Sequence, residues 1–342
     1  MLIASYTCLF QTAIQALTTS SMMTAIEKSK LRIGTRGSPL ALAQTHQVRD
    51  LLIAANPDLG EPGAVTIEVI KTTGDAILDR PLSELGGKGL FTREIDDAML
   101  AGTIDIAVHS MKDVPTYLPD GIVLPCMLER EDVRDAFLGR DHARLADLPE
   151  GSVVGTASLR RGAQILAMRP DIKVISFRGN VQTRLDKLAR GEADATMLAI
   201  AGLNRLGMAD KASSVLEIDE MLPAVAQGAV GVTCRAGDET AHRWLAPLNH
   251  RATQLCVEIE RAFLTRLDGS CRTPIGGLAR LKRVEDPSGT VFFRGMIIRT
   301  DGKVIHQTTR EGLAADGIAL GDDAGAELLA KAGPGFFQVG AL

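Results

Sequence analysis

Aromatic residues are scarce in this chain of 342 residues, since Phe, Tyr and Trp together make up 4% of it while hydrophobic residues make up 45%. Its cores must therefore be built mainly from aliphatic side chains. An excess of basic charge is also absent, because 42 acidic residues outnumber 38 Lys and Arg and give a formal net charge of −4. Nothing in the overall charge attracts nucleic acid or an anionic membrane, and we expect neither as a partner. Any anion site must come from a local cluster of basic side chains.

Paired cysteines and long apolar runs are absent as well. The cysteine number is odd, the spacing is wide and no C-x-x-C motif occurs, which argues against a disulfide framework or a zinc site and favours a reducing, cytoplasmic location. We expect no metal. No apolar run reaches about 18 residues, so we expect no transmembrane helix. The five cysteines are Cys8, Cys126, Cys234, Cys256 and Cys271.

The segment 1–30 differs in composition from the rest of the chain. It is rich in Ala, Ser and Thr and has no Lys or Arg before Lys28. Gln11, Thr12 and Gln15 interrupt its apolar residues, unlike the core of a secretory signal, and it lacks the arginines of a transit peptide. We expect residues 1–30 to form a disordered extension.

From Leu31 onward, strand-like and helix-like patterns alternate. Helical patterns follow most of the strands expected at 31–34, 65–71, 104–108, 152–155, 173–177 and 193–200. Strands that are apolar throughout and alternate with helices indicate parallel sheets covered on both faces. We therefore expect an α/β fold with one domain at 31–125 plus about 221–246, a second at 126–220, and a small α+β domain at 247–342.

Basic residues open several of the expected helices directly after strands. Ligands of open α/β sheets lie beyond the carboxyl ends of the strands, where helix N-termini present free N–H groups to anions. A single arginine at such a place is usually a solvated surface residue, but the recurrence predicts a carboxylate or polyanion site. Arg205 could join it or be an exposed charge at a helix end. The residues are Arg36 and Ser38, then Ser158, Arg160 and Arg161, then Arg178, Asn180 and Arg184.

The segment 109–113 places an acid beside a base after a buried strand. Asp113 there could act as general acid or base, or stabilise a cationic intermediate. The alternative is a simple surface pair of Lys112 with Asp113, and His109 is more simply a core histidine. The glycines around Lys88 do not form a phosphate-binding loop, because Gly89 follows where that motif needs Ser or Thr. We expect this glycine-rich segment to be a lid.

Cys271 lies in a Gly-Ser-Cys-Arg-Thr-Pro segment between an expected helix and an expected strand. Free cysteines are mostly inert and buried. A loop cysteine next to Arg272 is a better candidate for a nucleophile, because a nearby cation favours the thiolate. The sequence pattern alone leaves both interpretations open.

Several of these segments together resemble one family, the hydroxymethylbilane synthases, also called porphobilinogen deaminases. The resemblance runs from about Leu31 to the C-terminus. It rests on seven segments in order: 33–41 (IGTRGSPLA), 86–91 (GGKGLF), 107–115 (AVHSMKDVP), 129–132 (ERED), 155–161 (GTASLRR), 178–185 (RGNVQTRL) and 222–228 (LPAVAQG).

The resemblance implies two domains similar to the lobes of periplasmic binding proteins, followed by a third that carries Cys271. It implies a dipyrromethane cofactor joined to Cys271 by a thioether. Four porphobilinogen molecules are added to it stepwise with loss of ammonia, and hydrolysis then releases hydroxymethylbilane for tetrapyrrole biosynthesis. It also implies a monomer.

The resemblance further assigns roles to residues. Asp113 would be catalytic. Residues that would hold the cofactor are Lys112, Ser110, Ser158, Arg160, Arg161 and Arg184. Residues that would hold the substrate are Arg36, Ser38, Arg178, Arg205 and Gln227. Two rival interpretations remain at this stage: an anion-binding protein of the same two-lobed shape, and an acyl transferase with a cysteine nucleophile.

Overall fold

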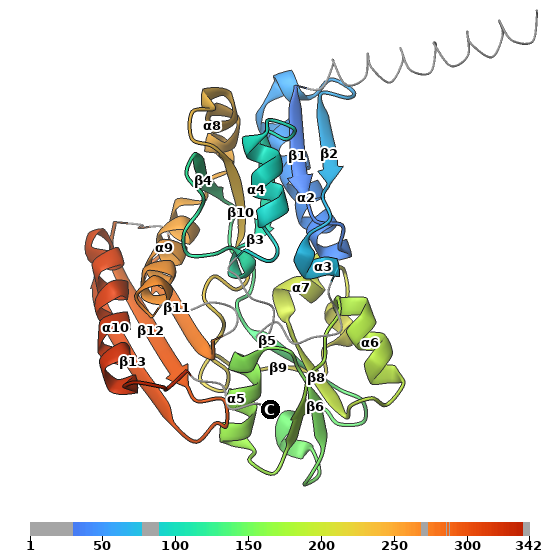
Figure 1. Cartoon of the computed structure of the whole chain (residues 1–342), viewed down its shortest axis with the longest axis vertical. Coiled ribbons are helices and arrows are strands. Elements are labelled where there is room, and N and C mark those ends of the chain that lie inside the picture. Colours follow the sequence, from blue (N-terminus) through green and yellow to red (C-terminus); the bar gives the residue numbers. More distant parts are fainter. Residues whose placement is uncertain (1–29, 77–88, 268–272, 285, 287, 338–342) are drawn as a thin grey trace, which may run out of the picture.

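The computed structural model describes residues 30–76, 89–267, 273–284, 286 and 288–337. These residues form three sheets, each with its own helices (Figure 1). The extension expected at 1–30 lies outside the described residues except for Lys30, and so do 77–88, most of the expected lid. The expected fold class of two α/β domains and a small C-terminal α+β domain is confirmed.

The first sheet has the strand order β2-β1-β3-β10-β4. Apolar side chains leave its two faces in alternation: Ile106 and Val108 of β3 pack under α2 and α8, while Ala107 packs under α4. Helices thus cover both faces. The elements are β1 (Leu31–Thr35), α2 (Pro39–Ala55), β2 (Val65–Val69), α3 (Thr73–Ala76), α4 (Arg93–Leu100), β3 (Ile106–Ser110), β4 (Ile122–Met127), β10 (Val230–Arg235) and α8 (Glu239–Leu245).

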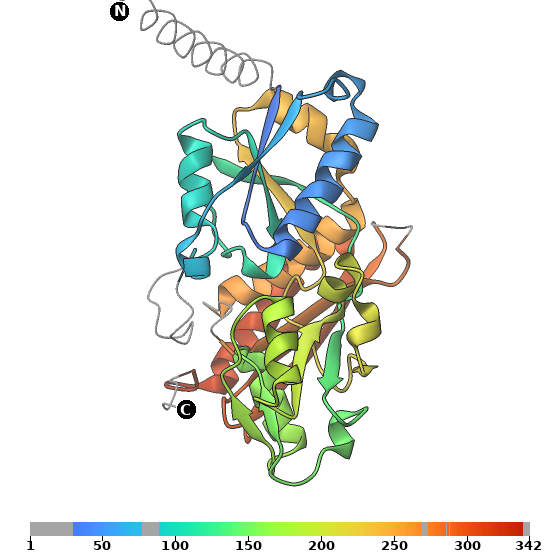
Figure 2. The ribbon, with the colours of Figure 1, turned by 90° about the vertical axis from the view of Figure 1, so that its right-hand side faces the viewer.

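The second sheet repeats this plan with the order β7-β6-β8-β5-β9. One face packs under α5 and the other under α6 and α7. Figure 2 shows the two α/β domains one above the other. The elements are β5 (Asp135–Gly139), β6 (Val153–Gly155), α5 (Leu159–Met168), β7 (Lys173–Ile175), α6 (Val181–Ala189), β8 (Ala195–Ala199), α7 (Ile200–Arg205) and β9 (Ser214–Val215).

Both sheets are mixed, whereas the sequence pattern predicted parallel sheets. β10 runs antiparallel to β3 and β4, and β5 runs antiparallel to β8 and β9. The reason is the crossing of the chain between the domains. A parallel strand needs a crossover that returns the chain to the far edge of the sheet. The chain arrives instead at the edge where β3 ends, so β10 begins opposite Ser110. β4 also continues to Met127, two residues past the expected domain end at 125.

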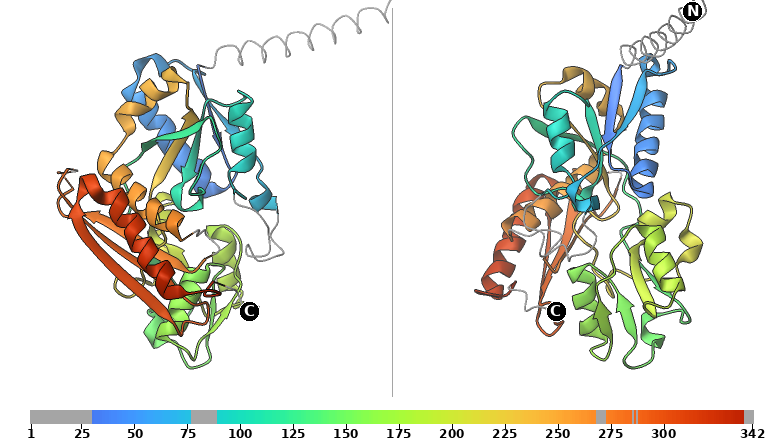
Figure 3. Two further views of the ribbon diagram at one scale, coloured as in Figure 1. Left: turned by 60° about the vertical axis from the view of Figure 1, so that its left-hand side comes forward. Right: turned by 45° about the vertical axis from the view of Figure 1, so that its right-hand side comes forward.

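The C-terminal sheet is an antiparallel meander in the order β11-β12-β13. α9 and α10 cover one face, which Figure 3 shows with α10 lying across the strands. Leu278, Met296 and Ile298 on the other face pack against Ala163 of α5. The elements are α9 (Arg251–Arg266), β11 (Ile275–Leu281), β12 (Thr290–Ile298), β13 (Ile305–Leu313) and α10 (Gly317–Ala332).

Six short 3₁₀ helices complete the described elements. They are η1 (Pro57–Leu59), η2 (Met111–Asp113), η3 (Leu145–Asp147), η4 (Ala209–Lys211), η5 (Ala246–Leu248) and η6 (Ala314–Asp316). None of the helices in the described part of the chain has the length and apolarity that a membrane span requires.

A buried ion pair joins the C-terminal domain to both connections between the α/β domains. Glu260 of α9 is fully buried and receives Arg130, whose Nη1 and Nη2 lie 2.6 Å and 3.0 Å from its two carboxylate oxygens. The same carboxylate accepts hydrogen bonds from the backbone N–H groups of Ala226 and Ala279. Removing either charged partner would leave an unpaired buried charge, which typically costs about 3–5 kcal/mol.

Asp96 of α4 is buried in the first α/β domain, so the stability of that domain should depend on pH. Burial, with a smaller effect of neighbouring Asp97, raises the pKa of the Asp96 carboxyl to about 6. Because the folded pKa lies above the unfolded value, the carboxyl stabilises the fold fully below about pH 4, and this contribution is lost as the pH rises through 6. We expect Asp96→Asn to raise the free energy of unfolding at pH 7.5 by about 2 kcal/mol, with the gain shrinking toward pH 4. Urea unfolding of both proteins at the two pH values measures this, and a gain independent of pH would contradict it.

Candidate active site

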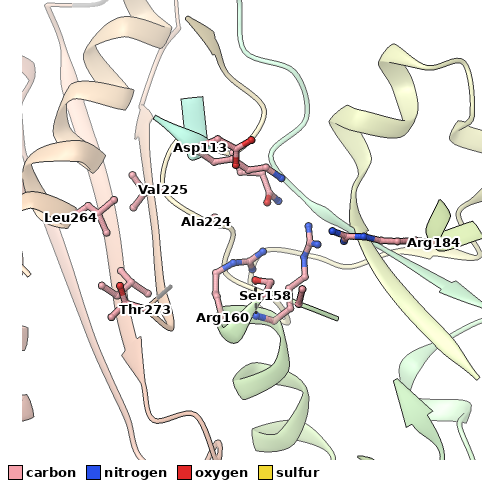
Figure 4. A pocket seen from close by; sticks show the side chains of 13 residues that line it. Asp113, Ser158, Arg160, Arg184, Ala224, Val225, Leu264 and Thr273 are labelled. Carbon is pink, nitrogen blue, oxygen red and sulfur yellow. Dashed lines mark hydrogen bonds between the residues drawn. The ribbon is translucent and has the colours of Figure 1, made fainter. Parts of the chain in front are cut away.

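A cavity of about 180 Å³ lies where the three domains meet. η2 and the N-terminal end of α5 contribute to it from the two α/β domains, and α9 and β11 line it from the C-terminal domain (Figure 4). Its polar lining carries four cationic side chains and one carboxylate. These polar residues are Lys112, Asp113, Ser158, Arg160, Arg161, Arg184, Gln227 and Thr273.

The start of α5 shows why the sequence places arginines here. β6 ends at Gly155, where a Cβ atom would lie 2.5 Å from the ring of Phe177, so only glycine fits. Ser158 then caps the helix by accepting a hydrogen bond from the N–H of Arg161. The strand end and the cap together direct the first turn of α5, with Arg160 and Arg161, toward the cavity.

Both of these arginines are buried and share one carboxylate. Asp135, the fully buried first residue of β5, lies 2.8 Å from Nη1 of Arg160 and 2.7 Å from Nη2 of Arg161. Burial alone would raise the pKa of the Asp135 carboxyl, but the two guanidinium groups reverse this and hold it well below its ordinary value. The three groups therefore leave one net positive charge beside the cavity.

Asp113 lies at the opposite side of the cavity and is partly exposed. Its Oδ2 is 3.6 Å from Nη1 of Arg36, which also donates to Asp75 and lies over the ring of Phe91. The ion pair of Asp113 is thus with Arg36, and not the surface pair with Lys112 that the sequence left open. Arg36 does not line the cavity. Its contact with the cavity is therefore indirect, through Asp113.

The remaining two cations have lowered proton affinities. Burial lowers the pKa of Lys112 to about 8, with opposing contributions from Asp113 and Asp135 and further lowering by Arg160 and Arg161. Burial and the neighbouring Arg161 and Arg178 lower the pKa of Arg184 to about 10. Cations that are costly to bury gain stability when anionic groups enter beside them.

Several predicted site residues lie away from the cavity lining. Ser110 donates to Gln44, Ser38 caps α2, and Arg205 donates to the backbone oxygen of Gly228. Asn180 caps α6, and Arg178 lies close enough to Arg184 to affect its charge. The interpretation of His109 as a core residue is confirmed, because it is buried and its Nε2 bonds the hydroxyl of Thr233. Among the described residues no cluster suited to a metal occurs.

Cys271 lies outside the described residues. Thr273 and Ile275, which follow it closely in the chain, line the cavity.

The sequence pattern did not predict Asp135 and Asp75, the carboxylates that pair with the arginines of the site. The signal for Asp135 was present in principle, since two adjacent buried arginines require a buried counter-charge. Nothing in the sequence spacing identifies which of the 42 acidic residues supplies it.

Comparisons with known proteins match most of the chain. The family model for the porphobilinogen deaminase dipyrromethane cofactor binding domain matches residues 31–243, and the model for the porphobilinogen deaminase C-terminal domain matches 254–330. A chloroplastic porphobilinogen deaminase of Oryza sativa is 60% identical over 91% of this chain and 86% of its own length. A porphobilinogen deaminase of Nitrobacter winogradskyi is 55% identical over 90% of this chain and 95% of its own length.

Among solved structures, a lipoprotein of Bacillus subtilis is 13% identical and has a TM-score of 0.38. It covers 65% of this chain and 90% of its own chain. A periplasmic substrate-binding protein of Coxiella burnetii is also 13% identical, with a TM-score of 0.39, and covers 64% and 91%. With both family models in sequence order and relatives of at least 55% identity along nine tenths of its length, this chain belongs to the porphobilinogen deaminase family and contains that family's dipyrromethane cofactor binding domain.

Proposed function

We propose that the cavity between the three domains is the site where this enzyme extends a dipyrromethane held on Cys271 with four porphobilinogen units. The observation that carries this assignment is the gathering of Lys112, Arg160, Arg161 and Arg184 around one space that also faces Asp113. Family membership makes the chain a transferase of porphyrin biosynthesis, and it sets aside the solute-receptor and acyl-transferase interpretations.

The hydrogen-bonding groups that line the cavity are suited to dipyrromethane. Two polar atoms of the residues that line it are buried and have no hydrogen-bond partner among the described residues: Nε of Arg160, a donor, and Oε1 of Gln227, an acceptor. A carboxylate of dipyrromethane can satisfy the first atom, and the ring N–H of a pyrrole can satisfy the second. We propose that Lys112, Ser158, Arg160, Arg161 and Arg184 hold its carboxylates. When bound, dipyrromethane supplies the pyrrole carbon to which the first porphobilinogen unit is joined.

The positive charge of the cavity matches the charge of the substrate. Porphobilinogen carries an acetate and a propionate, and a hydrogen bond between charged partners contributes about 1.5–3 kcal/mol. Arginine suits this task because its planar fork binds a carboxylate through two parallel hydrogen bonds. We propose that Ser110 binds the cofactor and that five further residues bind the substrate: Arg36, Ser38, Arg178, Arg205 and Gln227. Arg36, Ser38, Ser110 and Arg205 already bond within the protein and do not line the cavity, so for them this requires those contacts to be exchanged.

Asp113 is the carboxylate we propose for catalysis. Loss of ammonia from porphobilinogen leaves positive charge on the ring system, and a carboxylate at the cavity wall stabilises such charge. The same group can accept the proton that the joined ring loses. The guanidinium group of Arg36, whose Nη1 lies 3.6 Å from Oδ2 of Asp113, fixes the direction of this carboxylate.

We propose that the enzyme acts as a monomer in the cytoplasm. Cys126, Cys234 and Cys256 are buried free thiols, which suits a reducing compartment. Light scattering of the purified protein tests the monomeric state and should give a mass of about 36.4 kDa.

The tether on Cys271 is tested by mass. We expect the intact mass of the purified protein to exceed the sequence mass by one dipyrromethane, because the thioether survives denaturation. Cys271→Ser removes the attachment sulfur and should show the sequence mass alone, with activity lost. Cys256→Ser is the control, since that buried cysteine of α9 lies away from the cavity. A fully active protein without the added mass would contradict the tether.

The role of Asp113 is tested by separating cofactor loading from turnover. We expect Asp113→Asn to retain the added mass, because the cations that bind carboxylates are untouched, and to lose turnover by at least a hundredfold, within the range seen when a positioned acid–base group is removed. Asp120→Asn, an exposed change on the same connection, should keep parental activity. Turnover of Asp113→Asn within tenfold of the parent would refute an essential carboxylate.

A further inference from the structure

Asp135 lies beneath the cavity without lining it. Its side chain is fully buried, and its carboxylate contacts three side chains that do line the cavity: those of Arg160, Arg161 and Gln227. Asp135 can therefore affect a bound molecule only by deciding how these three groups are presented.

The two arginines meet Asp135 through different edges. Arg161 directs Nε and Nη2 to one carboxylate oxygen at 3.0 Å and 2.7 Å, and its Nη1 donates to the backbone oxygen of Met197. Arg160 uses Nη1 alone, which lies 2.8 Å from the other carboxylate oxygen and 2.7 Å from the backbone oxygen of Leu222. Its Nε is buried and has no partner among the described residues. The Nε–Nη2 edge of Arg160, the edge that binds a carboxylate in bidentate fashion, thus remains available.

Asp135 also fixes the amide of Gln227. The Nε2 of Gln227 donates to Oδ1 of Asp135 at 2.9 Å and to the backbone oxygen of Val133 at 2.8 Å. Turning the amide over would place its oxygen against two acceptors, so this orientation is the stable one. Oε1 is consequently left as a buried acceptor without a partner among the described residues. Only a donor such as a ring N–H can satisfy it.

We propose that Asp135 is a positioning residue that presents the Nε–Nη2 edge of Arg160 and the Oε1 of Gln227 to one pyrrole unit, the first for its carboxylate and the second for its ring N–H. This inference rests on the proposed function of the cavity. Without the carboxylate, two adjacent guanidinium groups would repel each other and the amide of Gln227 could turn over. The cavity would then lose both a directed donor pair and a directed acceptor.

The experiment compares Asp135→Asn with Asp105→Asn. Asp105 is the control, because it too is a carboxylate shared by two arginines, Arg32 and Arg235, with a side chain that is 17% exposed, and none of the three lines the cavity. The measurements on each purified full-length protein are melting temperature, the fraction of molecules that carry the dipyrromethane mass, and kcat/KM per loaded molecule. Asp135→Glu is the conservative variant, which keeps the charge on a longer side chain.

We expect both asparagine variants to melt at lower temperature and only Asp135→Asn to lose loading, to less than one fifth of its molecules. Asp135→Glu should restore loading to more than half. Full loading of Asp135→Asn with kcat/KM within threefold of the parent would overturn the proposal. Equal loss of loading in Asp105→Asn would also overturn it, because a general loss of stability would then explain both. A parent protein without the added mass would refute the proposed function instead.

Gln227→Met tests the acceptor even if Asp135→Asn fails to fold. This change keeps the side-chain length and leaves the charge of Asp135, Arg160 and Arg161 intact. We expect a loaded protein whose kcat/KM is about tenfold lower, since one hydrogen bond to the ring N–H is lost. A value within twofold of the parent would show that Oε1 accepts nothing in the reaction and would overturn that half of the proposal.

Discussion

One buried carboxylate allows two guanidinium groups to lie side by side under the cavity. Without Asp135, the first turn of α5 could not bury Arg160 and Arg161, because an unpaired charge away from water is far more costly than a pair. The strand β5, the helix α5 and the return connection at Gln227 all meet at this carboxylate. The position of the cations, and with it the chemistry of the cavity, depends on this single group.

A second buried carboxylate, that of Glu260, joins the C-terminal domain to the two connections between the α/β domains. Glu260 binds Arg130 on the outgoing connection and the N–H of Ala226 on the returning one. Both crossings between the α/β domains are therefore anchored to α9, whose Leu264 lines the cavity. The C-terminal domain thus closes the cavity from the side and fixes the two crossings at the same point. This explains how residues from three domains reach one space.

The sequence predicted the residues that line the cavity better than the carboxylates that pair with its arginines. Helix caps and strand ends are local features, so Ser158 and the arginines of α5 could be placed at a strand end from the pattern alone. The expected strands 104–108 and 152–155 overlap β3 and β6 for the same reason. Asp135 and Asp75 could not be found, because they meet their arginines through the fold, 26 and 39 residues away along the chain. The direction of β5 and β10 was missed because it depends on where the chain crosses between domains.

The charge of the proposed site also accounts for how an acidic protein could collect an acidic substrate. Among the described residues that line it, Lys112, Arg160, Arg161 and Arg184 are cationic and Asp113 is anionic. With Asp135 beneath them these six groups sum to +2, in a chain whose formal charge is −4. Charges on the surface are screened within about 8–10 Å by physiological salt, whereas buried cations are screened much less. An anion therefore gains little from the surface and much inside the cavity. Since burial also lowers the pKa of Lys112 and Arg184, these groups regain proton affinity when carboxylates enter, so binding and protonation favour each other.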